Sequence, residues 1–116
     1  MSMVRRIALV GLPGSGKTTI APLVARGLGW DAVDLDDEVA EASGRSPAAI
    51  IATDGERAFR DLELAALEAV LRRPGPVVIA CGGGLIAQPA ARRLLTELCT
   101  VVWLDAPDAV LIERVG

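Results

Sequence analysis

Apolar residues follow two different patterns along this chain, and the two alternate. Short continuous apolar runs such as Val77–Ala80 are typical of strands buried on both faces of a sheet. Glu56–Leu71 instead carries its apolar residues near helical spacing, which predicts a long amphipathic helix. We expect strands at Val4–Val10, Asp31–Leu35, Val77–Ala80 and Thr100–Leu104, and helices at Lys17–Leu28, Asp36–Ala42, Pro47–Ile51, Glu56–Leu71, Pro89–Leu98 and Pro107–Val115.

Strands that alternate with helices predict an α/β fold, in which helices cover both faces of a central parallel sheet of four strands. In such sheets ligands bind beyond the carboxyl ends of the strands. Residues 36–62 hold helices but no strand, so we predict a small lobe inserted beside the sheet, and we expect it to bind substrate. The whole chain, 1–116, is then a single domain. Ser46-Pro47 has the residues of a helix start, whereas Pro22 inside a predicted helix has no evident function.

Composition narrows the classes of protein that fit. With 116 residues, 52% of them hydrophobic, the chain is expected to fold as one globule. A net charge of −3 argues against nucleic-acid binding, and the absence of a long apolar run predicts no membrane span and a cytoplasmic location. Cys81 and Cys99 have no metal-ligand spacing and we expect them reduced. Without His or Tyr, a proton acceptor must be a carboxylate, a thiolate or the substrate itself.

The sequence Gly11-Leu12-Pro13-Gly14-Ser15-Gly16-Lys17-Thr18 matches G-x-x-x-x-G-K-[ST] between a predicted strand and a predicted helix. Small residues let backbone N–H groups converge on phosphates, and the helix N-terminus adds positive potential. In this motif Lys17 reaches the β and γ phosphates and Thr18 offers its hydroxyl to Mg²⁺. The motif therefore predicts binding of a nucleoside triphosphate.

Two acids follow the second predicted strand. Asp34 and Asp36 stand two residues apart, and in a strand this spacing places two carboxylates on one face. One could hold the water shell of Mg²⁺ and the other could orient or deprotonate an acceptor hydroxyl. Capping of the next helix by the acids Asp36 to Glu38 is the alternative.

Arg60 and a run of three glycines have less specific signals. Arg60 lies one helical turn from both Glu56 and Glu63, so taken alone it predicts an ordinary surface salt bridge. Gly82, Gly83 and Gly84 follow a buried strand, where bare backbone can approach a ligand, although a turn is the alternative.

In order and spacing, the segments GLPGSGKTT, DLD, GERAFRDLE, CGGG and VVWLDAP, followed by Arg114, closely resemble shikimate kinases. The resemblance spans the chain. It implies a P-loop kinase fold, of which four of the family's five strands are expected here. It also implies transfer of the γ-phosphoryl group of ATP, with Mg²⁺, to the 3-hydroxyl of shikimate in aromatic amino-acid biosynthesis.

Matched by position, the resemblance implies that Gly14, Ser15, Gly16, Lys17, Thr18 and Thr19 bind ATP and that Arg114 packs on adenine. It implies Thr18 and Asp34 for the metal, Asp36 beside the acceptor hydroxyl, and Arg60 for the substrate carboxylate. Gly82, Gly83 and Gly84 would contact shikimate through their backbone, and Lys17, Asp36 and Arg60 would be the catalytic residues. We expect a monomer.

The resemblance also has a departure at the end of the chain. Shikimate kinases continue past the position of Gly116 into a lid with a phosphate-contacting arginine, a second carboxylate-binding arginine and a last strand. We therefore expect a C-terminally shortened chain with negligible turnover by itself. The alternatives are a kinase for another small hydroxy or sugar acid, such as gluconate, and an inert nucleotide-binding fragment.

Overall fold

The computed structural model describes residues 5–11, 17–82, 84–106 and 109–113, with the backbone alone for 17–19, 105–106 and 109–113. Its elements, in chain order, are β1 (Arg6–Gly11), α1 (Lys17–Leu28), β2 (Asp31–Asp34), α2 (Leu35–Ser43), α3 (Pro47–Asp54), α4 (Glu56–Leu71), β3 (Val77–Ala80), a 3₁₀ turn (Leu85–Ala87), α5 (Pro89–Leu98), β4 (Thr100–Ala106) and β5 (Ala109–Glu113).

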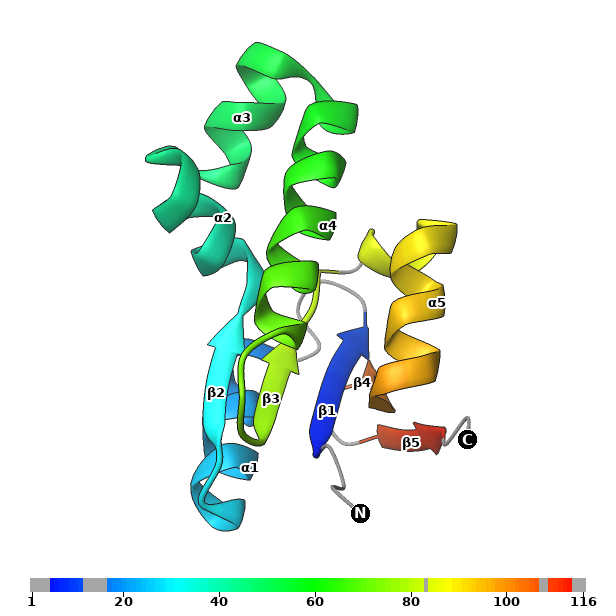
Figure 1. Cartoon of the computed structure of the whole chain (residues 1–116). Helices are drawn as coiled ribbons and strands as arrows, with labels where there is room; N and C mark the ends of the chain where they lie inside the picture. Colours follow the sequence, from blue (N-terminus) through cyan, green and yellow to red (C-terminus); the bar gives the residue numbers. More distant parts are fainter. Residues whose placement is uncertain (1–4, 12–16, 83, 107–108, 114–116) are drawn as a thin grey trace.

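The strands form one sheet in the order β2-β3-β1-β4-β5 (Figure 1). β1 pairs in parallel with β3 and with β4, and β2 pairs in parallel with β3. β5 is antiparallel to β4 and lies at the edge. The parallel strands bring the segments that follow β1, β2 and β3 to the same end of the sheet, where a ligand is expected.

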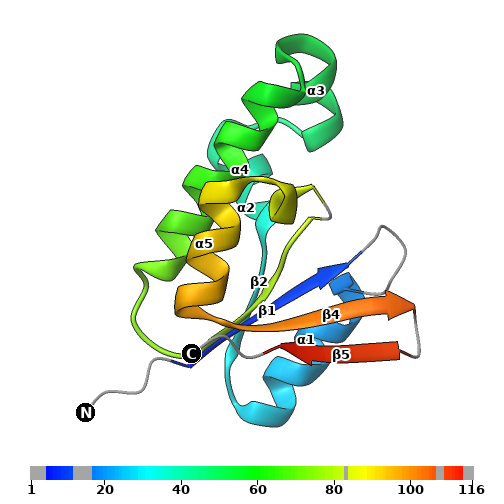
Figure 2. The same ribbon diagram turned by 90° about the vertical axis from the view of Figure 1, so that its right-hand side faces the viewer.

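Helices cover both faces of the sheet. α1 lies on one face and α4 and α5 lie on the other, as Figure 2 shows. Alternate residues of each strand supply the two cores: on β1, Ala8 and Val10 pack on the α4 and α5 side, and Leu9 packs on the α1 side. Among the described residues no helix is long and apolar enough to cross a membrane.

α2, α3 and the first turns of α4 extend beyond the sheet (Figure 1) and share a small core of Val39, Ile50 and Phe59. Two of their ends are capped, and the cap at Ser46 is the predicted one. The Ser46 hydroxyl accepts a hydrogen bond from the Ala49 N–H at 3.1 Å, and Gly44 ends α2 with a φ of 73°. The interpretation of the chain as one domain with a substrate-binding insertion at residues 36–62 stays a prediction.

The predicted α/β fold with four parallel strands is confirmed, and α1, α4, β3 and α5 have the predicted bounds. The other predicted elements differ at their ends; α3, for example, runs three residues further, to Asp54. The helix predicted at Pro107–Val115 is wrong, because residues 109–113 form β5. The run Ala109-Val-Leu-Ile-Glu is apolar enough for either element, and an antiparallel ladder along β4 satisfies its backbone as a strand.

Candidate active site

Three segments bring polar groups together beyond the carboxyl ends of the neighbouring strands β2 and β3. They are the start of α2, the second turn of α4, and the glycine loop after β3. Gly82 marks their meeting point, since a Cβ added there would lie 2.9 Å from Glu63 Oε2 and 3.7 Å from Asp36 Oδ1. The helices α2 and α4 and the carboxyl end of the sheet therefore meet at one cluster of charged side chains.

Arg60 is held in this cluster from three sides. Its Nη1 donates to Glu63 Oε1 at 2.8 Å, and its Nη2 donates to Glu56 Oε1 at 2.9 Å. Its guanidinium also lies against Gly84, where an added Cβ would be 2.2 Å from Cζ and Nη2. These carboxylates raise the pKa of Arg60, Glu63 first among them. The guanidinium is thus a fixed cation at the end of the sheet, with 26% of its side chain exposed.

Glu63 is the buried member of the cluster, with a residue exposure of 0%. Its Oε1 accepts the Arg60 hydrogen bond, while its Oε2 is buried and has no hydrogen-bond partner among the described residues. Burial raises the pKa of the Glu63 carboxyl, the Asp36 carboxylate raises it further, and the Arg60 guanidinium opposes both. The pair is therefore asymmetric, because Glu63 is enclosed and Arg60 reaches the surface.

The sequence predicts that Asp34 and Asp36 share one face of a strand, and the structure shows that this prediction is wrong. β2 ends at Asp34, and Asp36 lies in the first turn of α2. Asp34 is the N-cap of α2, since its Oδ1 accepts hydrogen bonds from the N–H groups of Asp36, at 2.9 Å, and Asp37, at 3.4 Å. The alternative, capping of this helix by Asp36 to Glu38, named the wrong residues, because the cap is Asp34 and its bond fixes the backbone of Asp36.

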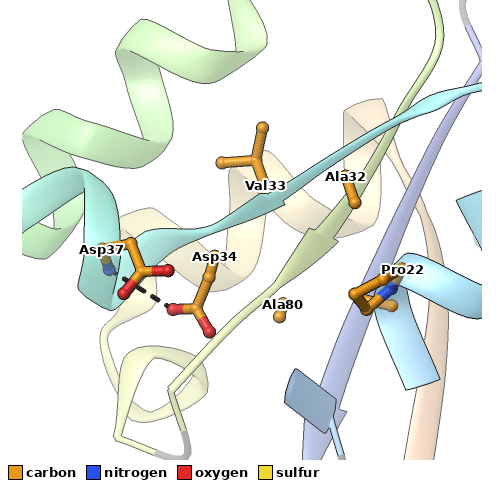
Figure 3. Close-up of a pocket in the computed structure, with 7 residues that line it drawn as sticks. Pro22, Ala32, Val33, Asp34, Asp37 and Ala80 are labelled. Atoms are coloured by element: carbon orange, nitrogen blue, oxygen red, sulfur yellow. Dashed lines mark hydrogen bonds between the residues drawn. The ribbon is translucent and has the colours of Figure 1, made fainter. Parts of the chain in front are cut away.

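A cavity of about 170 Å³ lies beside Asp34, between β2 and α1 (Figure 3). Asp34 and Asp37 supply its carboxylates, and the rest of its lining is apolar: Ala21, Pro22, Ala32, Val33 and Ala80. The cavity is smaller than the ~300 Å³ at which small-molecule sites usually begin. It does show that Asp34 faces the early turns of α1.

The sequence of the glycine-rich loop lies between β1, which ends at Gly11, and α1, which begins at Lys17. The strand and helix predicted on either side of the loop are therefore confirmed. The helix start carries the positive end of the α1 dipole toward the carboxyl end of the sheet. Residues 12–16 themselves lie outside the described residues, and so do Gly83 and Arg114.

A scan against known protein families matches residues 13–116 to the family described as shikimate kinase. The chain belongs to the shikimate kinase family. A shikimate kinase of Rhodopirellula baltica is 44% identical over 112 residues, which are 97% of this chain and 59% of that protein.

Solved structures give the same result. The shikimate kinase of Aquifex aeolicus is 37% identical with a TM-score of 0.81, over 89% of this chain and 61% of that one. The shikimate kinase of Acinetobacter baumannii, solved in complex with shikimate, is 35% identical with a TM-score of 0.84, over 88% and 56%. The chain thus spans a little over half the length of these relatives.

The structure brings together several residues that the resemblance to shikimate kinases singled out: Asp36, Arg60, Gly82 and Gly84 meet in one cluster. Asp34 lies beside it as the cap of α2. Lys17, Thr18 and Thr19 are the first residues of α1, and the structure describes their backbone alone. Five further predicted site residues lie outside the described residues: Gly14, Ser15, Gly16, Gly83 and Arg114. The roles of all these residues stay predictions.

Glu63 was missed as a site residue, although the sequence holds a signal for it. It lies four residues from both Phe59 and Leu67, in the apolar stripe of α4 that faces the core. A carboxylate in such a stripe is rarely left without a partner.

Proposed function

We propose that the protein to which this chain belongs transfers the γ-phosphoryl group of ATP to the 3-hydroxyl of shikimate. The observation that carries this proposal is the Arg60 guanidinium, a fixed cation between Glu63 and Gly84 at the end of the sheet where α/β proteins bind ligands. A guanidinium is suited to a carboxylate because its fork donates two parallel hydrogen bonds. The family membership supplies the acid, shikimate.

Each proposed role follows from the chemistry of the residue. Arg60 binds the substrate carboxylate and so fixes the ring, while Asp36, 3.7 Å from the position of a Gly82 Cβ, accepts the proton of the attacking hydroxyl. The start of α1, with Lys17, binds the phosphates. Such positioning and charge neutralisation are the main catalytic requirements of phosphoryl transfer.

Mg²⁺ would be held by Thr18 and, through water, by Asp34. Carboxylate and hydroxyl oxygens are ligands that Mg²⁺ prefers, and Asp34 lines the same cavity as Ala21, one turn after Thr18 on α1. When bound, the ion would neutralise charge on the transferred phosphoryl group. We also propose a cytoplasmic location, since Cys81 and Cys99 form no disulfide in the described part of the chain, as is usual in a reducing compartment. We propose a monomer by default.

Calorimetric titration of shikimate, in the presence of ADP and Mg²⁺, tests the proposal. The wild-type chain should bind shikimate in preference to gluconate, and Arg60→Ala should abolish binding. Arg60→Lys should also bind weakly, because an ammonium keeps the charge but lacks the fork. Equal binding by the wild-type chain and Arg60→Ala would exclude Arg60 as the shikimate-binding group, and a preference for gluconate would exclude shikimate as the substrate.

A further inference from the structure

Arg60 makes two ion pairs, and the two differ sharply in burial. The side chain of Glu63 is 1% exposed, whereas that of Glu56 is 69% exposed. Breaking the Glu63 pair leaves a buried carboxylate without its cation, but a Glu56 carboxylate that leaves Arg60 enters water at once. The Glu63 contact is therefore the lasting one, and the Glu56 contact is the one that can exchange.

The nitrogen that Glu56 holds is the one a carboxylate ligand needs. A guanidinium offers two edges for a bidentate carboxylate, Nη1 with Nη2 and Nε with Nη2, and both include Nη2. Glu56 Oε1 accepts from Nη2 at 2.9 Å. Any ligand that binds Arg60 through two parallel hydrogen bonds must share or take over this nitrogen.

Charge favours replacement over sharing. Arg60 carries one positive charge and already contacts two carboxylates, and Asp36 is close enough to affect the titration of Glu63. A third carboxylate on the same guanidinium would meet an excess of negative charge among the described residues. Gly84 limits access to the guanidinium from one further side, because a Cβ added at Gly84 would lie 2.2 Å from Arg60 Cζ.

We propose that Glu56 is an internal carboxylate that occupies the substrate-binding nitrogen of Arg60 and is displaced when the carboxylate of the substrate binds. This inference rests on the proposed function for the identity of the ligand, shikimate, but not for the displacement itself. Glu56 keeps Arg60 paired in the empty site and lowers its affinity for carboxylates. Exposed ion pairs of this kind imply an effect of about two- to fivefold.

The test compares the wild-type chain with Glu56→Gln and a matched control, Asp61→Asn. Asp61 is exposed, lies on the same helix and makes no ion pair among the described residues, so this control removes the same charge without touching Arg60. Binding is followed by NMR through the Nε–H signal of Arg60, which is assigned by its loss in Arg60→Lys. The ligands are shikimate, its methyl ester and cyclohexanecarboxylate.

Glu56→Gln should bind shikimate about two- to fivefold more tightly than the wild-type chain, with the methyl ester unaffected and Asp61→Asn close to wild type. A structural role for Glu56 would instead give weaker binding, because Arg60 would lose its support. Unchanged or weaker binding of carboxylates by Glu56→Gln, or an equal gain in Asp61→Asn, overturns the inference.

The two proposals can fail separately. If shikimate does not bind but cyclohexanecarboxylate binds Glu56→Gln more tightly than wild type, displacement holds and the proposed substrate is wrong. If neither carboxylate perturbs Arg60 in either chain, the exchange role of Glu56 is wrong as well.

Discussion

Gly84→Ala isolates the placement of Arg60 from the rest of the fold. Gly84 has a φ of −81° and a ψ of −13°, a conformation that alanine adopts without strain. The atoms nearest to the added methyl group belong to the Arg60 guanidinium, whose Cζ and Nη2 lie 2.2 Å from the Cβ position. The obstacle is the end of a flexible side chain, so the side chain must move and the backbone can stay.

The size of the displacement follows from the geometry. Ordinary contact begins at 3.4 Å and the gap is 2.2 Å, so the guanidinium must move by the difference, about 1.2 Å. That shift is enough to misalign a bidentate pair with a substrate carboxylate. Loss of a charge-assisted hydrogen bond costs about 1.5–3 kcal/mol, which corresponds to about 10- to 150-fold weaker binding of shikimate. Weakening of the Arg60–Glu63 pair should cost about 1–3 kcal/mol of folding stability.

Calorimetric titration with shikimate measures the loss of affinity, and urea denaturation measures the free energy of unfolding. Gly27→Ala is the matched control, because Gly27 lies inside α1 with nothing within 4 Å of its added Cβ. It should bind shikimate normally and gain about 0.5–1 kcal/mol of stability. A Gly84→Ala chain that binds shikimate like wild type would refute the argument that this glycine makes room for Arg60.

Three further predictions concern titration, thiol reactivity and a helix cap. Burial raises the pKa of Glu63 in the folded chain above the ordinary value of 4.5. The folded state therefore keeps this proton at pH values just above 4.5, where the unfolded state has lost it. The free energy of unfolding of the wild-type chain should then fall with pH through this window relative to Glu63→Gln, and parallel urea-denaturation profiles of the two chains would contradict this sign. Burial raises the pKa of Cys99 to about 11, so about one thiol in a thousand is ionised at pH 8. Iodoacetamide should modify Cys99 far more slowly in the native chain than in urea, as measured by mass spectrometry of its peptide, and equal rates would show that this thiol is accessible. Ser46→Ala removes the hydroxyl that accepts from the Ala49 N–H and should cost about 1 kcal/mol in urea denaturation, with no change expected for the exposed Ala48→Ser.

The sequence predicts best those elements whose limits are set by local signals. α4 begins after Gly55, which has a φ of 94° that few other residues adopt, and its apolar stripe, which Glu63 alone interrupts among its buried residues, runs to Leu71. The end of the chain shows the opposite case. Residues 109–113 have no local signal that separates helix from strand, and their pairing with β4 decides the matter. Such a partner is not visible in the local pattern.

Burial of a side chain is the other property that the local sequence pattern does not reveal. Glu56 and Glu63 both stand one helical turn from Arg60, and spacing alone makes both of them surface partners. In the structure they differ from 69% to 1% in side-chain exposure, because α4 packs on the sheet along the stripe that contains Glu63. The reading of Arg60 as an ordinary surface salt bridge was therefore wrong in one respect: one of its two partners is buried.

The burial of Glu63 is hard to explain by stability. Replacing a buried ion pair with apolar residues of similar size is often neutral or stabilising, and a leucine between Phe59 and Leu67 would continue the apolar stripe. The Glu63 carboxylate instead orients Arg60, since it holds one nitrogen of the guanidinium while Gly84 limits the position of the guanidinium from another side. Arg60, Glu63 and Gly84 thus work as one unit, and the effects of substituting them on ligand binding should not add, because each substitution disturbs the same cation.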